Sequence, residues 1–152
     1  MIFTIIINVG SGRKMKIVYW SGTGNTEKMA QLIKEGFAQA GKDAETIIVS
    51  DVNVDEILKE DVLILGCSAM GDEVLEESEF EPFIDEISTK ISGKKVALFG
   101  SYGWGDGQWM RDFEERMIGY GCTIIDTPLI IQNEPDDSEQ DCIDFGKKIA
   151  IL

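Results

Sequence analysis

Six consecutive residues carry groups that together can bind an anion. Ser21, Gly22, Thr23, Gly24, Asn25 and Thr26 follow a short apolar run and precede a segment with helical spacing of apolar side chains. A strand, a glycine-containing turn and a helix N-terminus in this order present backbone N–H groups and hydroxyls to a negative charge. The six residues include no lysine or arginine. We therefore expect an anion held by neutral donors.

This loop lacks the two familiar phosphate patterns. It is not G-x-x-x-x-G-K-[ST], which argues against a nucleoside triphosphate with magnesium. Gly22 and Gly24 have the first spacing of the dinucleotide fingerprint, but position 27 is Glu. Converging hydroxyls and amides fit a terminal monophosphate better than a bridging diphosphate. The alternative is a plain turn in which Asn25 or Thr26 caps the helix.

A second unusual loop is formed by Ser68, Ala69, Met70, Gly71, Asp72 and Glu73. Gly71 adopts positive φ at little cost, so the peptide that links it to Asp72 can reverse between turn types. The polarisable sulfur of Met70 suits packing against a flat ring. The alternatives are a core methionine and an ordinary turn.

The third loop is Ser101-Tyr102-Gly103-Trp104-Gly105-Asp106-Gly107. A tryptophan between glycines has little local core in which to bury its ring, so we expect it to cover a planar group. A protein partner surface is the competing explanation.

Apolar runs and helical spacings alternate along the chain and position these loops. Strands are predicted at 16–20, 45–49, 62–66 and 95–100, with a broken fifth strand at 123–126 and 129–132. Helices are predicted at 26–40, from a capping box at 78–81, around 110–117 and around 142–149, with a short turn and helix at 51–58. This pattern predicts a three-layer, doubly wound α/β fold with a five-stranded parallel sheet. All three loops then lie at the carboxyl ends of the strands, where such folds bind ligands.

Composition limits the possible functions. The 152 residues suit one domain, and 28 Asp and Glu against 14 Lys and Arg give a net charge of −14. That charge argues against nucleic acid and anionic membranes and favours basic protein partners, unless it is only a solvated acidic surface. The absence of histidine excludes imidazole acid–base chemistry and histidine metal sites. Ten acidic and no basic residues between positions 60 and 89 penalise added negative charge on a ligand nearby.

The remaining features concern cellular context. Cys67, Cys122 and Cys142 form no CxxC pair and suit buried thiols in a reducing compartment, and no apolar run is long enough to span a membrane, so we expect a cytoplasmic protein. Residues 1–14 lack the basic n-region and the small-residue cleavage site of a signal peptide. We expect them to be a translated leader before a natural start at Met15, with 15–152 as the domain; an extra strand is the alternative.

Taken together, SGTGNT, SAMGDE and SYGWGDG closely resemble the flavodoxins, most of all the short-chain clostridial kind. The resemblance runs from Met15 to the C-terminus, and the N-terminal extension departs from it. It implies a flavodoxin-like fold with strand order 2-1-3-4-5 that binds one non-covalent FMN.

The resemblance also implies residue roles. Ser21 to Thr26 would hold the FMN phosphate, Met70 and Trp104 would sandwich the isoalloxazine ring, and Glu73 would accept from N3–H. The Gly71–Asp72 peptide would flip on reduction so that its carbonyl accepts from N5–H. Ser68, Ser101 and Asn133 are candidates for ribityl or phosphate contacts. The predicted cofactor-binding set further includes Ala69, Tyr102, Gly103 and Gly105.

The implied function is low-potential, one-electron transfer between neutral semiquinone and anionic hydroquinone, in place of ferredoxin-type carriers. Such a monomeric carrier needs no catalytic residue and docks with basic-faced redox proteins. The alternative is an NAD(P)H-dependent flavin oxidoreductase on the same fold. Trp104 argues against it, as does the acidic rim, by which we mean Asp72, Glu73, Glu76, Glu77 and Glu79. A receiver-like signalling domain would need paired acids after the first strand and a lysine after the fifth, and Tyr19-Trp20 and Ile131-Gln132 supply neither.

Overall fold

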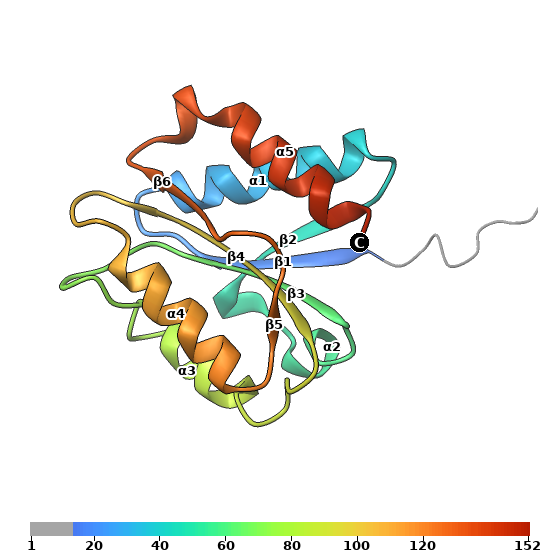
Figure 1. Ribbon diagram of the computed structural model, residues 1–152, viewed down its shortest axis with the longest axis vertical. Coiled ribbons are helices and arrows are strands. Elements are labelled where there is room, and N and C mark those ends of the chain that lie inside the picture. The colour runs from blue at the N-terminus through green and yellow to red at the C-terminus, as the bar shows by residue number, and fades with distance from the viewer. Residues whose placement is uncertain (1–13) are drawn as a thin grey trace, which may run out of the picture.

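Parallel strands form the middle layer of the computed structural model, which describes residues 14–152. The strands are β1 (Met15–Trp20), β2 (Ala44–Ile48), β3 (Val62–Cys67), β4 (Lys95–Tyr102), β5 (Thr123–Ile124) and β6 (Leu129–Gln132). Their order is β2-β1-β3-β4-β5, and β6 also pairs with β4 (Figure 1). The predicted order is confirmed. The leader hypothesis falls, except for Lys14, outside the described residues and stays a prediction.

The fifth position of the sheet is divided between two short strands, as the broken pattern predicts. Thr123 in β5 lies beside Lys95 at the start of β4, and Leu129 in β6 lies beside Phe99 further along it. Between them Asp126 has a φ of 60°. Pro128 follows, and proline has no N–H to donate to a strand. These residues interrupt the pairing.

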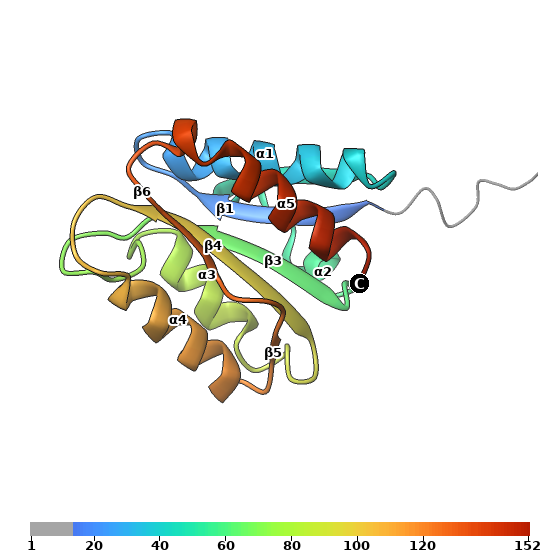
Figure 2. The same ribbon diagram turned by 45° about the horizontal axis from the view of Figure 1, so that its top comes forward.

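Helices cover both faces of the sheet. They are α1 (Asn25–Gln39), α2 (Val54–Ile57), α3 (Phe80–Ile87), α4 (Gln108–Gly119) and α5 (Glu139–Ala150), with short 3₁₀ turns at Val49–Asp51 and Pro135–Asp137. Figures 1 and 2 show α1 and α5 on one face and α2, α3 and α4 on the other. Each face has its own buried apolar core, with Phe37 and Phe145 on the first and Phe80 and Phe113 on the second. The three-layer prediction is confirmed.

The two helices on the first face touch through glycines. A Cβ atom on Gly36 of α1 would lie 2.1 Å from the carbonyl oxygen of Ile143, and one on Gly146 of α5 would lie 2.1 Å from that of Ile33. No real side chain tolerates such distances, so the backbones approach this closely only because both residues lack a side chain. The contact fixes the position of α1, whose N-terminus follows the first loop.

The start of α3 differs from its prediction. The capping box expected at 78–81 is wrong, because the N-cap is Glu79, whose side chain makes no capping hydrogen bond, and the N–H of Glu81 donates to the carbonyl oxygen of Glu76. The carboxylate of Glu76 serves instead: it accepts from the backbone N–H groups of Ser78 at 2.7 Å, Glu79 at 2.7 Å and Phe80 at 2.9 Å. Burial alone would raise the pKa of Glu76, but these hydrogen bonds outweigh it and hold the pKa below its usual value.

Candidate functional site

The three unusual loops meet at the carboxyl edge of the sheet, on the left of Figure 1. They surround a hollow of about 300 Å³ that is lined by Trp20, Gly22, Thr23, Asn25, Ser68, Ala69, Met70, Ser101, Tyr102, Gly103 and Asn133. All of these except Trp20 belong to the predicted set. The other predicted residues, which do not line the hollow, are Ser21, Gly24, Thr26, Gly71, Asp72, Glu73, Trp104 and Gly105.

The first loop presents unpaired donors. The hydroxyl of Ser21 accepts from the N–H groups of Gly24 and Glu27, both at 3.2 Å, and so holds the turn against the first helical turn. Gly24, with φ 98°, is the N-cap of α1, so neither Asn25 nor Thr26 caps the helix. Within the described part of the chain, the N–H groups of Thr23, Asn25 and Thr26 donate to no protein acceptor. Together with the helix N-terminus they are neutral donors that could hold an anion.

Thr26 lies beneath the hollow and joins all three loops. Its side chain is fully buried, and its Oγ1 lies 2.7 Å from Ser68 Oγ and 3.0 Å from Ser101 Oγ. It also accepts from the backbone N–H of Ser101 at 3.2 Å. Ser68 follows β3 and Ser101 lies near the end of the neighbouring β4, so the position of one hydroxyl depends on those of the other two. Sequence alone did not indicate this network.

The second loop is a narrow turn. Met70 and Val74 exchange two backbone hydrogen bonds of 2.9 Å, which close the segment that contains Gly71, Asp72 and Glu73. Gly71 has a φ of 48°. A Cβ atom there would meet nothing within 4 Å, so the backbone conformation, and not crowding, requires glycine. The side chain of Met70 is 37% exposed at the rim.

Glu73 connects the second loop to the third. Its Oε1 accepts from the N–H groups of Gly107 at 3.2 Å and Gln108 at 3.0 Å, at the N-terminus of α4. A carboxylate is favoured at this end of a helix. Gly105, with φ 87°, passes so close that a Cβ atom would lie 2.4 Å from Glu73 Cδ. The implied contact from Glu73 to flavin N3–H stays a prediction.

The third loop exposes its tryptophan. Trp104 is 63% exposed, far more than Trp109, whose Nε1 donates to the carbonyl oxygen of Cys67 at 3.0 Å. The adjoining backbone is held in place, because Gln132 donates to the carbonyl oxygen of Gly103 and Asn133 donates to that of Tyr102. Trp104 therefore offers an unburied ring on an anchored loop, which is what a planar ligand needs.

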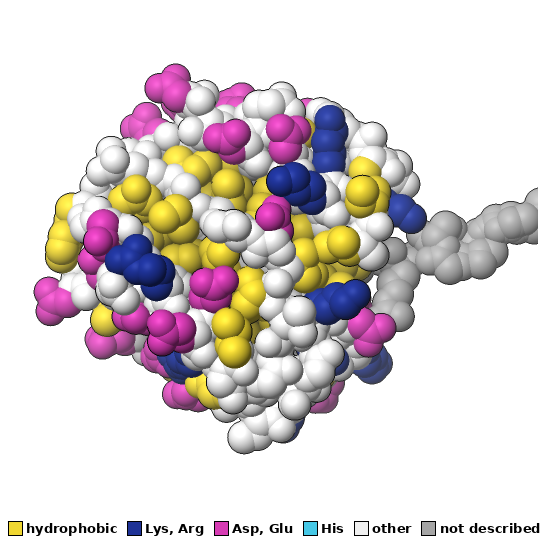
Figure 3. Space-filling view, viewed as in Figure 1, with side chains coloured by type: hydrophobic (Ala, Val, Ile, Leu, Met, Phe, Trp, Pro, Cys, Tyr) yellow, Lys and Arg dark blue, Asp and Glu magenta, His cyan; other side chains and the backbone are white. Residues whose placement is uncertain are grey.

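The donors and rings fit the cofactor that the resemblance implies. A cation-free set of amides and hydroxyls suits one phosphate, and exposed Met70 and Trp104 supply apolar surface for a flat ring. Asp72, Glu73 and Glu79 carry negative charge on the second loop and just after it, and Figure 3 shows acidic side chains beside hydrophobic ones on the side where the loops lie. In the described residues no cluster of three metal-binding side chains occurs.

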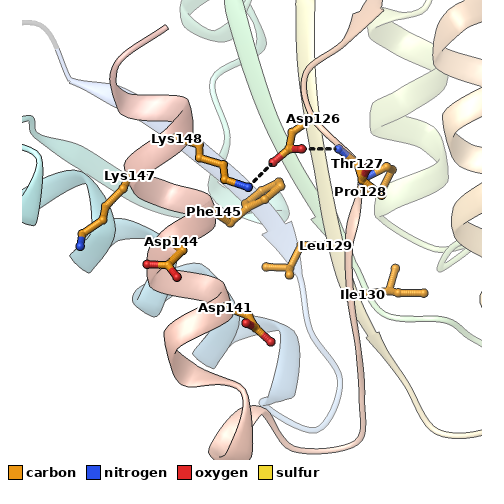
Figure 4. A pocket seen from close by; sticks show the side chains of 10 residues that line it. All are labelled: Asp126, Thr127, Pro128, Leu129, Ile130, Asp141, Asp144, Phe145, Lys147 and Lys148. Atoms are coloured by element: carbon orange, nitrogen blue, oxygen red, sulfur yellow. Dashed lines mark hydrogen bonds and ion pairs between the residues drawn. The ribbon is translucent and has the colours of Figure 1, made fainter.

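A larger hollow, of about 660 Å³, lies away from the three loops (Figure 4). It runs between α5 and the segment that joins β5 to β6, with Leu129 and Phe145 in it and an Asp126–Lys148 ion pair of 3.5 Å at one end. None of the predicted cofactor-binding residues lines it. Size alone therefore does not locate the site. None of the described helices is both long enough and apolar enough to cross a membrane.

Known proteins resemble this chain over most of its length. The family model described as flavodoxin matches residues 17–146. The chain is 82% identical to a flavodoxin of Clostridium beijerinckii over 136 residues. This alignment covers 90% of the chain and 99% of the relative. The chain is also 47% identical to a flavodoxin of Megasphaera elsdenii over 136 residues, an alignment that covers 90% of the chain and 98% of the relative.

A solved structure has the same fold. The solution structure of two-electron reduced Megasphaera elsdenii flavodoxin matches with a TM-score of 0.83 and 46% identity over 91% of this chain and 99% of that one. These relatives bear the name of an electron carrier, which does not favour the oxidoreductase alternative. The chain belongs to the flavodoxin family, whose members bind FMN and carry electrons rather than turn over a substrate of their own.

Proposed function

We propose that the chain is a low-potential, one-electron carrier that uses its FMN between the neutral semiquinone and the anionic hydroquinone and serves where ferredoxin-type carriers serve. The observation that carries this proposal is electrostatic: no charged side chain lines the hollow, and the nearby Asp72, Glu73 and Glu79 are acidic. When bound, FMN supplies the redox chemistry. Among the described residues no lysine or arginine lines the hollow to balance a negative ring, so adding the second electron is disfavoured.

In this proposal the three loops have separate tasks. Residues 21–26 hold the phosphate through unpaired N–H groups and hydroxyls, with Ser68 and Ser101 beside them. Met70 and Trp104 flank the ring and exclude water from it. The peptide that links Gly71 to Asp72 would turn so that its carbonyl could accept a hydrogen bond from N5–H of the flavin. Asn133 and the backbone around Tyr102 support the ribityl chain.

The experiment is an anaerobic spectroelectrochemical titration of wild type and Gly71→Ala. We assign the positive φ of Gly71, which this structure has, to the turn arrangement that pairs with the semiquinone. A side chain at positive φ costs about 1–2 kcal/mol. We expect less semiquinone in the variant, with the reduction potential of each one-electron step displaced by about 59 mV for each 1.4 kcal/mol. Gly41→Ala is the matched control, since Gly41 also has positive φ and open space but follows α1 far from the loops. Equal semiquinone yield in wild type and Gly71→Ala would rule out the turn mechanism.

Partner binding follows from the same charges. We propose that basic-faced redox proteins dock at the acidic rim of a monomeric carrier in the cytoplasm. Neutralising Asp72 and Glu77 together should raise the second potential and weaken the salt dependence of electron transfer to a basic acceptor. Glu35 and Glu45 are exposed and lie on α1 and β2, so Glu35→Gln with Glu45→Gln is the control for net charge. If both double variants change the rate equally, docking at the rim is wrong.

A further inference from the structure

Trp20 is a lining residue that the sequence analysis did not select. It ends β1, where it pairs with Cys67 of β3, and its ring borders the hollow. A Cβ atom on Gly22 would lie 3.0 Å from Trp20 Cη2 and 3.3 Å from Cζ3. The backbone of the first loop therefore lies directly against the indole, which supports the segment that carries the unpaired donors.

One side chain outside the hollow fixes this indole. The Nε1–H of Trp20 donates to Glu79 Oε1 at 3.3 Å. Glu79 stands at the start of α3, but its carboxylate does not cap that helix, because Glu76 does so. The Glu79 carboxylate is therefore available to the indole. Glu79 itself does not line the hollow.

We propose that Glu79 is a positioning residue that holds the indole of Trp20 under the phosphate loop and so strengthens binding of the phosphate-bearing flavin. This inference rests on the proposed phosphate site at residues 21–26. Charge alone predicts the opposite sign, since a carboxylate near an anion site weakens anion binding. Removal of Glu79 thus separates the two effects: positioning predicts a loss of affinity, and simple repulsion predicts a gain.

The experiment compares FMN and riboflavin binding to the apoprotein by flavin fluorescence quenching. For Glu79→Ala we expect the Kd for FMN to rise about three- to ten-fold and the Kd for riboflavin to change less than about twofold, as loss of one hydrogen bond predicts. Glu79→Gln keeps an oxygen that accepts from the indole, so it should recover most of the affinity. Glu77→Ala removes another exposed carboxylate two residues away and should leave FMN binding unchanged or tighter.

A second readout follows the hydrogen bond itself. In the apoprotein the indole N–H resonance of Trp20, assigned through Trp20→Phe, should move in Glu79→Ala and stay in place in Glu77→Ala. Tighter FMN binding by Glu79→Ala, or an equal loss for FMN and riboflavin, would overturn the positioning role. Equal wild-type affinity for the two flavins would instead refute the phosphate site, so the two failures are distinguishable.

Discussion

The buried carboxylate of Glu76 is expected to stabilise the fold, and the variant Glu76→Gln tests it. Oε1 accepts from two backbone N–H groups and Oε2 from a third, and the residue is 7% exposed. Glutamine keeps one acceptor oxygen and places an NH₂ group where Oε2 meets the N–H of Ser78. The variant loses one charge-assisted hydrogen bond and leaves a donor facing a donor, which costs about 2–3 kcal/mol.

Thermal unfolding of the apoprotein measures this effect. For a domain of this size, 1 kcal/mol corresponds to about 2–4 °C in Tm, so a decrease of roughly 4–12 °C is expected at neutral pH. Because the pKa of Glu76 is lowered by folding, its contribution is present above the unfolded-state pKa and is lost as the pH falls through the folded-state pKa. The difference between wild type and variant should therefore shrink in acid.

The matched control is Glu77→Gln, which makes the same charge change at an exposed neighbour. It should alter the Tm by little, since surface substitutions are usually within about 0.5 kcal/mol. Equal Tm values for Glu76→Gln and Glu77→Gln would refute the capping role of Glu76. The same comparison shows why Glu76 should not be neutralised in tests of the acidic rim.

Two further predictions concern stability. Gly36→Ala should destabilise the protein by about 1–3 kcal/mol in urea unfolding, because the new methyl meets the backbone of α5, whereas Gly119→Ala at the end of α4 has open space and should cost nothing; similar losses for both would disprove close helix contact. Burial, with a hydrogen bond to Glu27, raises the pKa of Tyr19 to about 12. The stability that the Tyr19 hydroxyl contributes is thus complete below pH 10 and is lost as the pH rises from about 10 to about 12. In this range the free energy of unfolding should fall less steeply with pH in Tyr19→Phe than in wild type; identical slopes would count against the raised pKa.

Sequence patterns predicted the strands well because these are nearly continuous apolar runs, which only a doubly covered parallel sheet buries. The three loops were also predictable, since glycines and hydroxyls after strands mark the carboxyl edge. The residues that cap α1 and α3 were not predicted, because Ser21 and Glu76 accept from N–H groups a few residues further along the chain without occupying the usual N-cap position. Trp20 lies beside the first loop in sequence and also in space. Its position directly before the loop could have identified it, but it is also part of the apolar strand.

The glycine contact between α1 and α5 constrains when the protein becomes able to hold its cofactor. Synthesis delivers α1 early and α5 last among the described helices, yet α1 buries its apolar side against α5. On the ribosome, the helix that begins at the phosphate loop therefore lacks its packing partner until the rest of the sheet has emerged. Cofactor capture is then a step that follows the synthesis of α5, and a nascent chain that stops before Gly146 should not retain FMN.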